Sequence, residues 1–176
     1  MPETISSEPI YQGRIFDVRI DTIREGEIEY KREIIAHRGS CVIVPVFADG
    51  TVALVRQYRH AAGKYLLEIP AGSLEEGEVP ETGAIRELEE EIGVTTGKIE
   101  LIAEFYVSPG FLTEKMFVYL ATELTETTQN LEDDEIVEVE RIPLEKALEM
   151  ARNGEIEDAK TIVGLLFTAG KLGIAG

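Results

Sequence analysis

The sequence contains a single cysteine and few basic residues, and each shortage excludes classes of protein. Among 176 residues, the one cysteine, Cys41, allows neither an internal disulfide nor a cysteine-based zinc cluster. It lies in an apolar run and is expected to be a buried thiol. Only 17 lysines and arginines stand against 34 acids, which gives a formal net charge of −17. Because such a chain repels phosphate backbones, we expect no nucleic acid and no membrane among its partners.

Long apolar segments are also missing. The longest, Ile162 to Ala169, is interrupted by Gly164 and falls short of the about 20 residues that a membrane span needs. The start, Met1 to Pro9, is polar and acidic and lacks the pattern of a secretory leader. Together with the lone cysteine, these features predict a reducing, cytoplasmic location.

The length and the ordinary globular composition predict one main domain with a small N-terminal extension. Residues 1–38 contain short runs of strand character joined by turns, so we expect a small β-sheet there. This segment would pack on the main body or on a second subunit. The main domain is expected to cover residues 39–176.

Strands and helices alternate along the main domain. Val79 to Val94 is the clearest helix, since Pro80 suits a first helical position and Gly93 a left-handed end. Two more helices are expected at Leu144 to Asn153 and Ala159 to Lys171. Strands are expected at 41–47, 51–58, 65–69, 99–107, 115–121 and 136–142, with the first two forming a hairpin. This order predicts an α/β (or α+β) sandwich with a mixed sheet.

The first helix carries an acidic stripe. Glu87, Glu90 and Glu91 stand at positions i, i+3 and i+4, which places them on one face, while apolar residues occupy another. Neighbouring like charges on a helix are unfavourable by a few tenths of a kcal/mol per pair. A divalent cation would relieve the repulsion, and hard oxygen ligands favour Mg²⁺ or Mn²⁺. Taken alone, the stripe could equally be a solvated acidic face.

The residues around this helix resemble the Nudix box, G-x5-E-x7-R-E-U-x-E-E-x-G-U, where U is a bulky aliphatic residue. Every fixed position is filled, by Gly72, Glu78, Arg86, Glu87, Leu88, Glu90, Glu91, Gly93 and Val94. The resemblance implies a Nudix-type α/β/α sandwich with a mixed central sheet, preceded here by the N-terminal β-sheet. It also implies a hydrolase that cuts a nucleoside diphosphate linked to another group.

The same resemblance implies a site for two or three Mg²⁺ ions, with Mn²⁺ able to replace them. Glu87 and Glu91 would be direct ligands, and the backbone carbonyl of Ala71 would complete one site. Glu90 would be a ligand or would lie close behind the ligands, and it is a catalytic candidate for the same reason. Such ions neutralise a diphosphate and lower the pKa of a bound water, and a nearby carboxylate can take the proton.

Two further residues of the box have supporting roles in this picture. Arg86 would orient the carboxylates through salt bridges rather than touch the substrate. Glu78 would either reach the metal through water or brace the loop before the helix.

Segments outside the box resemble the ADP-ribose pyrophosphatase branch of the family. They are 56–59, 67–72 and the Ser108-Pro109-Gly110 turn with Glu114, and Pro109 lies 16 residues after Gly93. A Pro-Gly turn is also common between strands. The resemblance implies hydrolysis of ADP-ribose to AMP and ribose 5-phosphate. The alternatives are GDP-mannose or another nucleotide sugar, a dinucleoside polyphosphate, a nucleoside triphosphate, or a regulator that binds ADP-ribose without cleaving it.

The resemblance to this branch also implies a homodimer, because its members are homodimers that exchange their N-terminal sheets. Arg59 is the better candidate for binding the substrate's phosphates or terminal ribose, and Arg56 is a lesser one. Arg32 could reach the neighbouring subunit's site. Either Tyr11 or Phe16 could stack on adenine, although both residue types are more often core. Glu68 could hydrogen-bond the ribose hydroxyls. The whole substrate-binding set is Tyr11, Arg32, Arg56, Arg59, Glu68, Ser108, Pro109, Gly110 and Glu114.

The general base in this branch comes from a loop after the box. The candidate here is the acidic segment 131–135, which could also be a solvated loop. Its spacing from Ile136 favours Glu132 as the base and Asp134 as an added metal contact. Glu135 is the alternative base.

Overall fold

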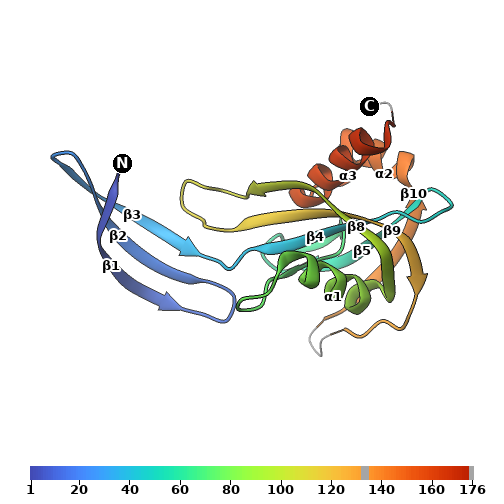
Figure 1. Cartoon of the computed structure of the whole chain (residues 1–176), viewed down its shortest axis with the longest axis horizontal. Coiled ribbons are helices and arrows are strands. Elements are labelled where there is room, and N and C mark those ends of the chain that lie inside the picture. Colours follow the sequence, from blue (N-terminus) through green and yellow to red (C-terminus); the bar gives the residue numbers. More distant parts are fainter. Residues whose placement is uncertain (132–134, 175–176) are drawn as a thin grey trace.

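The computed structural model describes residues 1–131 and 135–174 of the chain. Ten strands and three helices lie within these residues (Figure 1). In order they are β1 (Glu3–Gln12), β2 (Asp17–Glu25), β3 (Ile28–Ala36), β4 (Ser40–Pro45), β5 (Thr51–Arg59), β6 (Lys64–Glu68), β7 (Ala71–Ser73), α1 (Pro80–Ile92), β8 (Val94–Tyr106), β9 (Lys115–Glu126), β10 (Val137–Pro143), α2 (Leu144–Asn153) and α3 (Ala159–Leu172).

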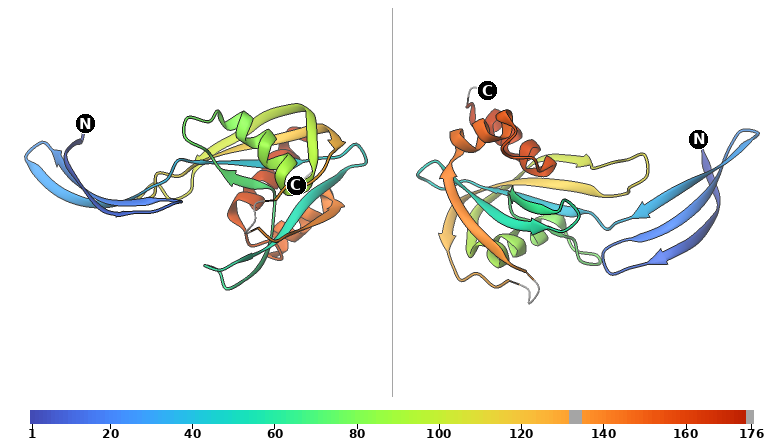
Figure 2. Two further views of the ribbon diagram at one scale, coloured as in Figure 1. Left: turned by 90° about the horizontal axis from the view of Figure 1, so that it is seen from below. Right: turned by 180° about the vertical axis from the view of Figure 1, so that it is seen from behind.

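The N-terminal strands form a sheet of their own. β1, β2 and β3 pair antiparallel, and the sheet projects from the main body as an arm (Figures 1 and 2). Its link to the body runs through β3, where the Ile35 N–H donates to the Phe111 carbonyl over 2.7 Å. Every residue of β1 is exposed. The expected N-terminal β-sheet is therefore present, and none of the described residues forms a layer over β1.

The body contains two sheets between helices. A mixed sheet has the order β7-β4-β9-β8, with β4 and β9 parallel, and an antiparallel sheet has the order β10-β5-β6. Helix α1 lies on one side of these strands and α2 and α3 on the other (Figure 1). The predicted sandwich with a mixed sheet is confirmed.

The predicted hairpin of residues 41–47 and 51–58 is wrong. The Asp49-Gly50 turn is present, but β4 and β5 diverge into different sheets, and the isolated bridge between Val46 and Val52 joins them. The physical reason is that β4 is buried along its whole length. It takes the central position of the mixed sheet, where the later strands β7 and β9 pair with both of its edges.

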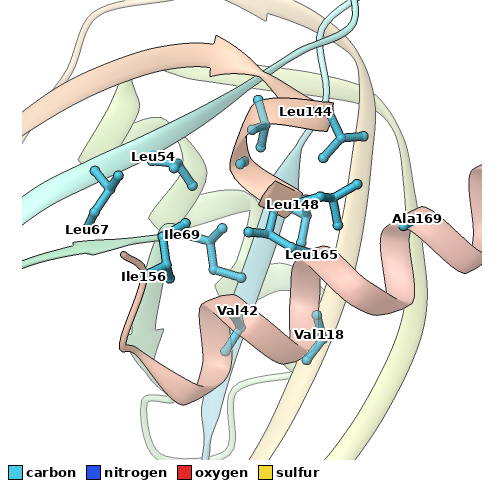
Figure 3. Packing of buried hydrophobic residues seen from close by; sticks show 13 residues of the cluster. Val42, Leu54, Leu67, Ile69, Val118, Leu144, Leu148, Ile156, Leu165 and Ala169 are labelled. Atoms are coloured by element: carbon cyan, nitrogen blue, oxygen red, sulfur yellow. The ribbon is translucent and has the colours of Figure 1, made fainter. Parts of the chain in front are cut away.

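Side chains of β4 alternate between two hydrophobic cores. Val42 and Val44 face α2 and α3, where Leu148 and Leu165 are also buried (Figure 3). Cys41 and Ile43 face α1 and pack with other residues of that core, among them Ala84, Leu88 and Ile92. The predicted buried thiol is confirmed, and burial raises the pKa of Cys41 to about 12, so the thiol stays protonated.

The helix termini follow the sequence signals. Helix α1 begins at Pro80 and ends at Gly93, whose φ of 64° is the left-handed conformation that glycine adopts without strain. Helix α3 begins after Asp158, whose side chain accepts a hydrogen bond from the Thr161 N–H. The start of each helix determines which residues of α1 and α3 form the first turn beside the sheets.

Candidate active site

Arg86 donates hydrogen bonds to three carboxylates, those of Glu78, Glu87 and Glu90. Its Nε and Nη2 donate to the two oxygens of Glu78 over 3.1 Å each. Its Nη1 donates to Glu87 Oε1 over 2.6 Å and to Glu90 Oε2 over 2.9 Å. As expected, Arg86 orients the acids of the helix. Glu78 also accepts the Glu75 N–H over 2.9 Å, so in this structure it braces the loop before α1.

Glu87 is packed against the backbone of β7. A Cβ added at Gly72 would stand 1.9 Å from Glu87 Oε1, so a larger residue at position 72 would displace the Glu87 carboxylate. Glu87 is 8% exposed, and its pKa is raised, first by burial. The Gly72 position of the box therefore has a steric reason: it makes space for a carboxylate.

Glu91 lies one helical turn further along and is more deeply buried. It is 3% exposed, and its Oε2 accepts the Ala71 N–H over 3.1 Å. Burial, followed by the negative charge of Glu87, raises the pKa of Glu91 to about 8. Two neighbouring buried acids are costly unless a cation compensates their charge.

This set of donors fits a hard divalent cation. Glu87, Glu91 and Ala71 offer oxygen ligands, and neither cysteine nor histidine is among them. Within residues 1–131 and 135–174, no three acidic, histidine or cysteine side chains converge into a ready-made metal site.

A cavity of about 500 Å³ opens beside these carboxylates. Its volume is in the range of small-molecule sites. Acids and arginines share its walls, which is what a metal-neutralised phosphate needs. The lining comprises Arg14, Ile15, His37, Arg38, Arg59, Ala71, Gly72, Ser73, Leu74, Glu75, Arg86, Glu87, Glu90 and Glu135.

Several residues proposed from the sequence are thus brought together. Ala71, Glu87, Glu90, Glu135 and the better arginine candidate, Arg59, all line one cavity. The charge of Glu135 also acts on Glu87 and Glu91, raising the pKa of each. Glu132 and Asp134 lie outside the described residues.

Glu68 lies beneath Arg59 rather than at the cavity wall. It is 1% exposed and accepts two hydrogen bonds of 2.7 Å from the Arg59 guanidinium. Burial would raise the pKa of Glu68, but the bonds from Arg59 and the charge of Lys160 outweigh it and hold the pKa below the ordinary value. In this structure the carboxylate faces those cations, and its expected contact with ribose hydroxyls stays a prediction.

Three other substrate-binding candidates lie away from the cavity. Arg56 donates to Glu140 on the neighbouring strand β10 over 2.6 Å. Arg32 lies on the arm with its guanidinium 4.3 Å from the centre of the Tyr30 ring. Tyr11, also on the arm, is 55% exposed, and its ring centre is 6.1 Å from that of Phe16. The role predicted for Arg32 at the neighbouring subunit's site and the stacking of Tyr11 on adenine both stay predictions.

The Ser108-Pro109-Gly110 segment forms the turn between β8 and β9. The N–H groups of Phe111 and Leu112 donate to the Ser108 carbonyl over 3.2 and 2.9 Å. Glu114, after this turn, accepts from Ser40 Oγ over 2.6 Å and lies 3.9 Å from His37 Nδ1. Glu114 therefore contacts a cavity-lining residue without lining the cavity itself.

Sequence reasoning missed the basic rim of this cavity. Arg14 and Ile15 lie at the turn between β1 and β2, which reaches the loop before α1, and Arg38 follows β3. His37 also lines the cavity, and its Nδ1 accepts the Gly39 N–H over 3.0 Å. Residues 1–38 contain six of the 17 lysines and arginines of the chain, and this high share was the available signal for the rim.

Comparison with known proteins decides the family. A family model described as the NUDIX domain matches residues 37–163, well over half of the chain. The chain belongs to the Nudix family. It is therefore a Nudix hydrolase, as the spacing of the box predicted, and the Nudix box is the segment that carries Glu87 and Glu91.

Three of the curated relatives of this Nudix protein carry different descriptions. An ADP-ribose pyrophosphatase of Bacillus subtilis (strain 168) is 40% identical over 94% of this chain and 91% of its own. A methanol dehydrogenase activator of Bacillus methanolicus is 35% identical over the same shares. A GDP-mannose pyrophosphatase of Salmonella typhimurium is 38% identical over 91% of each chain. All three are similar over nearly their full length.

A solved structure supports the fold. The crystal structure of an ADP compounds hydrolase matches with a TM-score of 0.84, over 99% of this chain and 97% of that one. At 21% identity this likeness shows the fold alone. In the described part of the Nudix chain, no helix combines the length and the apolar character needed to cross a membrane.

Proposed function

We propose that this Nudix protein hydrolyses the diphosphate bridge of ADP-ribose to give AMP and ribose 5-phosphate, with Mg²⁺ as its cofactor. The observation that carries the proposal is the buried pair Glu87 and Glu91 beside a cavity that Arg59 also lines. The relative described as an ADP-ribose pyrophosphatase, at 40% identity, supports the choice of substrate.

The residues of the box have complementary roles in this reaction. Glu87, Glu91 and the Ala71 carbonyl would hold the metal, and Glu90, which shares Arg86 with Glu87, lies beside them. When bound, Mg²⁺ neutralises the diphosphate, polarises a phosphorus and lowers the pKa of a water. Arg59 would bind a phosphate oxygen, because this residue lines the cavity and the delocalised N–H donors of a guanidinium suit phosphate.

A carboxylate of the 131–135 segment is proposed as the general base. Glu135 lines the cavity and is the supported candidate among the described residues. Glu132 stays the prediction from spacing, and Asp134 the predicted added metal contact. A base must lie within hydrogen-bond reach of the attacking water, directly or through one other water.

A second candidate substrate is GDP-mannose. It is favoured by the relative described as a GDP-mannose pyrophosphatase, which is 38% identical over 91% of this chain. Both substrates carry a diphosphate between a nucleoside and a sugar, so the carboxylates and Arg59 would act on either in the same way. Discrimination would come from the contacts to the base and to the sugar.

The deciding experiment is a substrate panel with Mg²⁺. ADP-ribose, GDP-mannose, a dinucleoside polyphosphate and a nucleoside triphosphate are incubated separately, and the products are separated by chromatography. AMP and ribose 5-phosphate with the highest kcat/KM from ADP-ribose support the proposal. Calorimetric binding of ADP-ribose without any product would indicate a regulator that binds without cleaving.

We also propose that two chains form a homodimer through the arm of residues 1–38, treated as a unit distinct from the main domain at 39–176. The arm is a three-stranded sheet, and a sheet with an apolar face is stable when a second layer covers it. Large apolar side chains stay exposed on it, namely Ile5, Ile10, Tyr11, Ile15, Phe16 and Ile28. A second copy would cover them and bring Arg32 toward a neighbouring site.

A cytoplasmic location is proposed on the chemistry of the chain. The single cysteine is buried and unpaired with another cysteine, which fits a reducing compartment. Separating cell fractions and detecting the protein with an antibody tests this, and recovery in an extracellular fraction would contradict it.

A further inference from the structure

Glu68 is a buried acid that contacts two cations from different parts of the chain. It accepts Arg59 Nε at Oε1 and Arg59 Nη2 at Oε2, and it also accepts Lys160 Nζ at Oε2. Lys160 lies 92 residues further along the chain, in the first turn of α3. With an exposure of 1%, the carboxylate of Glu68 depends on these donors in place of water.

Lys160 is itself fixed by the start of α3. Its side chain is 11% exposed, and Nζ lies 3.0 Å from Asp158 Oδ1. The other oxygen of Asp158 accepts the N–H and hydroxyl of Thr161 over 2.9 and 2.5 Å. Thr161 Oγ1 in turn accepts the Ile69 N–H over 2.9 Å. Two adjacent residues of α3, Lys160 and Thr161, therefore hold two adjacent residues where β6 ends, Glu68 and Ile69. Ala71 follows Ile69 by two positions.

The consequence reaches the cavity through Arg59. Two of the five N–H groups of Arg59 are used by Glu68, and the guanidinium, 41% exposed in its side chain, lines the cavity. If Lys160 were absent, Arg59 would be the one of these two cations that still donates to Glu68. Glu68 Oε2 would then have lost one of the two donors that hold it, and the direction of the guanidinium bonded to the carboxylate would be less firmly fixed.

We propose that Lys160 is a positioning residue of this Nudix hydrolase: by holding the Glu68 carboxylate, it fixes Arg59 in the direction that receives a substrate phosphate. The inference rests on the proposed function, since it assigns Arg59 to the diphosphate. Lys160 does not line the cavity and acts through Glu68 and Arg59.

The test compares Lys160→Met with a matched control from the same helix. Lys171 also forms an ion pair, with Glu100, but on the exposed surface, so Lys171→Met removes a similar pair far from Arg59. For Lys160→Met we expect the KM for ADP-ribose to rise about tenfold and kcat to stay within about twofold of the wild-type value. The lost interaction stabilises the bound substrate and the transition state equally, so its loss changes KM rather than kcat. Lys171→Met should have the kcat and KM of the wild type. Lys160→Arg should have a KM close to the wild-type value.

A double-mutant cycle separates positioning from a general structural role. In an Arg59→Met background, the further change Lys160→Met should leave KM unchanged, because the residue through which it acts is gone. The affinity for AMP, measured by calorimetry, should fall with KM and does not depend on turnover. If Lys160→Met fails to fold, Lys160→Gln, which keeps a donor but removes the charge, is measured in its place.

The possible results distinguish this inference from the proposed function. A wild type that cleaves none of the panel overturns the proposed function. A wild type that cleaves ADP-ribose, with Lys160→Met or Lys160→Gln keeping the wild-type KM and AMP affinity, overturns the role of Lys160 alone. The same holds if the KM effect persists in full without Arg59.

Discussion

The carboxylate of Glu87 occupies the space where a side chain at residue 72 would begin. A Cβ on Gly72 would lie 1.9 Å from Glu87 Oε1 and 2.0 Å from its carboxyl carbon. Arg86 Nη1 donates to the same oxygen, Glu87 Oε1, over 2.6 Å. The Glu87 carboxylate is therefore held by an arginine of the box at a place that depends on the missing side chain of a glycine of the same box.

Gly72→Ala should displace Glu87 and reduce activity. Displacing a metal ligand by about 1 Å can cost about a hundredfold in rate, so we expect kcat to fall by about that factor. Gly170→Ala is the control, because nothing lies within 4 Å of an added Cβ there. The measurement is kcat with saturating Mg²⁺, together with the melting temperature. Wild-type turnover in Gly72→Ala would contradict the ligand role of Glu87.

Glu91→Gln should abolish turnover and yet stabilise the metal-free protein at high pH. The pKa of Glu91 is raised to about 8 from an ordinary 4.5, because it is buried beside Glu87. The folded chain thus binds a proton that the unfolded chain has already lost, so stability falls as pH rises from about 4.5 to about 8. Glutamine removes this dependence and keeps an acceptor for the Ala71 N–H.

The check is the melting temperature of both proteins at pH 6 and pH 8.5, with and without Mg²⁺. In the wild type, Mg²⁺ should raise the melting temperature most at pH 8.5, where Glu91 gives up its proton to bind the ion. Glu91→Gln should show little response. A wild type whose melting temperature ignores Mg²⁺ at both pH values would argue against a metal at Glu91.

Glu135→Gln should lower kcat while leaving binding intact. Losing a general base costs about a hundredfold to ten-thousandfold in rate, and KM for ADP-ribose should stay near its wild-type value. Glu138→Gln, on the exposed part of β10, is the control. If Glu132→Gln shows the loss and Glu135→Gln keeps wild-type kcat, the base is Glu132.

Ile10→Asp should convert the proposed dimer into a monomer. Ile10 is 54% exposed on β1 and lines an apolar groove of the arm, where a buried charge would oppose association. Leu166→Asp, on the exposed face of α3, should leave the dimer intact. Light scattering at several protein concentrations measures the mass. A wild type that is monomeric throughout, or a dimer lost in Leu166→Asp instead, would contradict the arm interface.

The sequence by itself determined the local chemistry. The spacing of the box placed Glu87, Glu90 and Glu91 on one face of α1, since helical geometry follows from residue number. Pro80 and Gly93 marked its ends because their backbone preferences are intrinsic. Three helices and a mixed sheet also followed from the order of elements. The position and ends of α1 rest on preferences and contacts of residues close in the chain, whereas the order of elements does not say which strands pair.

Only the tertiary structure decided which distant segments meet. Residues 41–47 and 51–58 have the pattern of a hairpin, yet β4 pairs with β7 and β9, because its fully buried strand needs a neighbour on each edge. Likewise, the pairing of Glu68 with Lys160 joins residues that no period relates. Such contacts depend on which charged groups pair and which apolar surfaces pack together across the whole chain. A local sequence pattern does not contain that information.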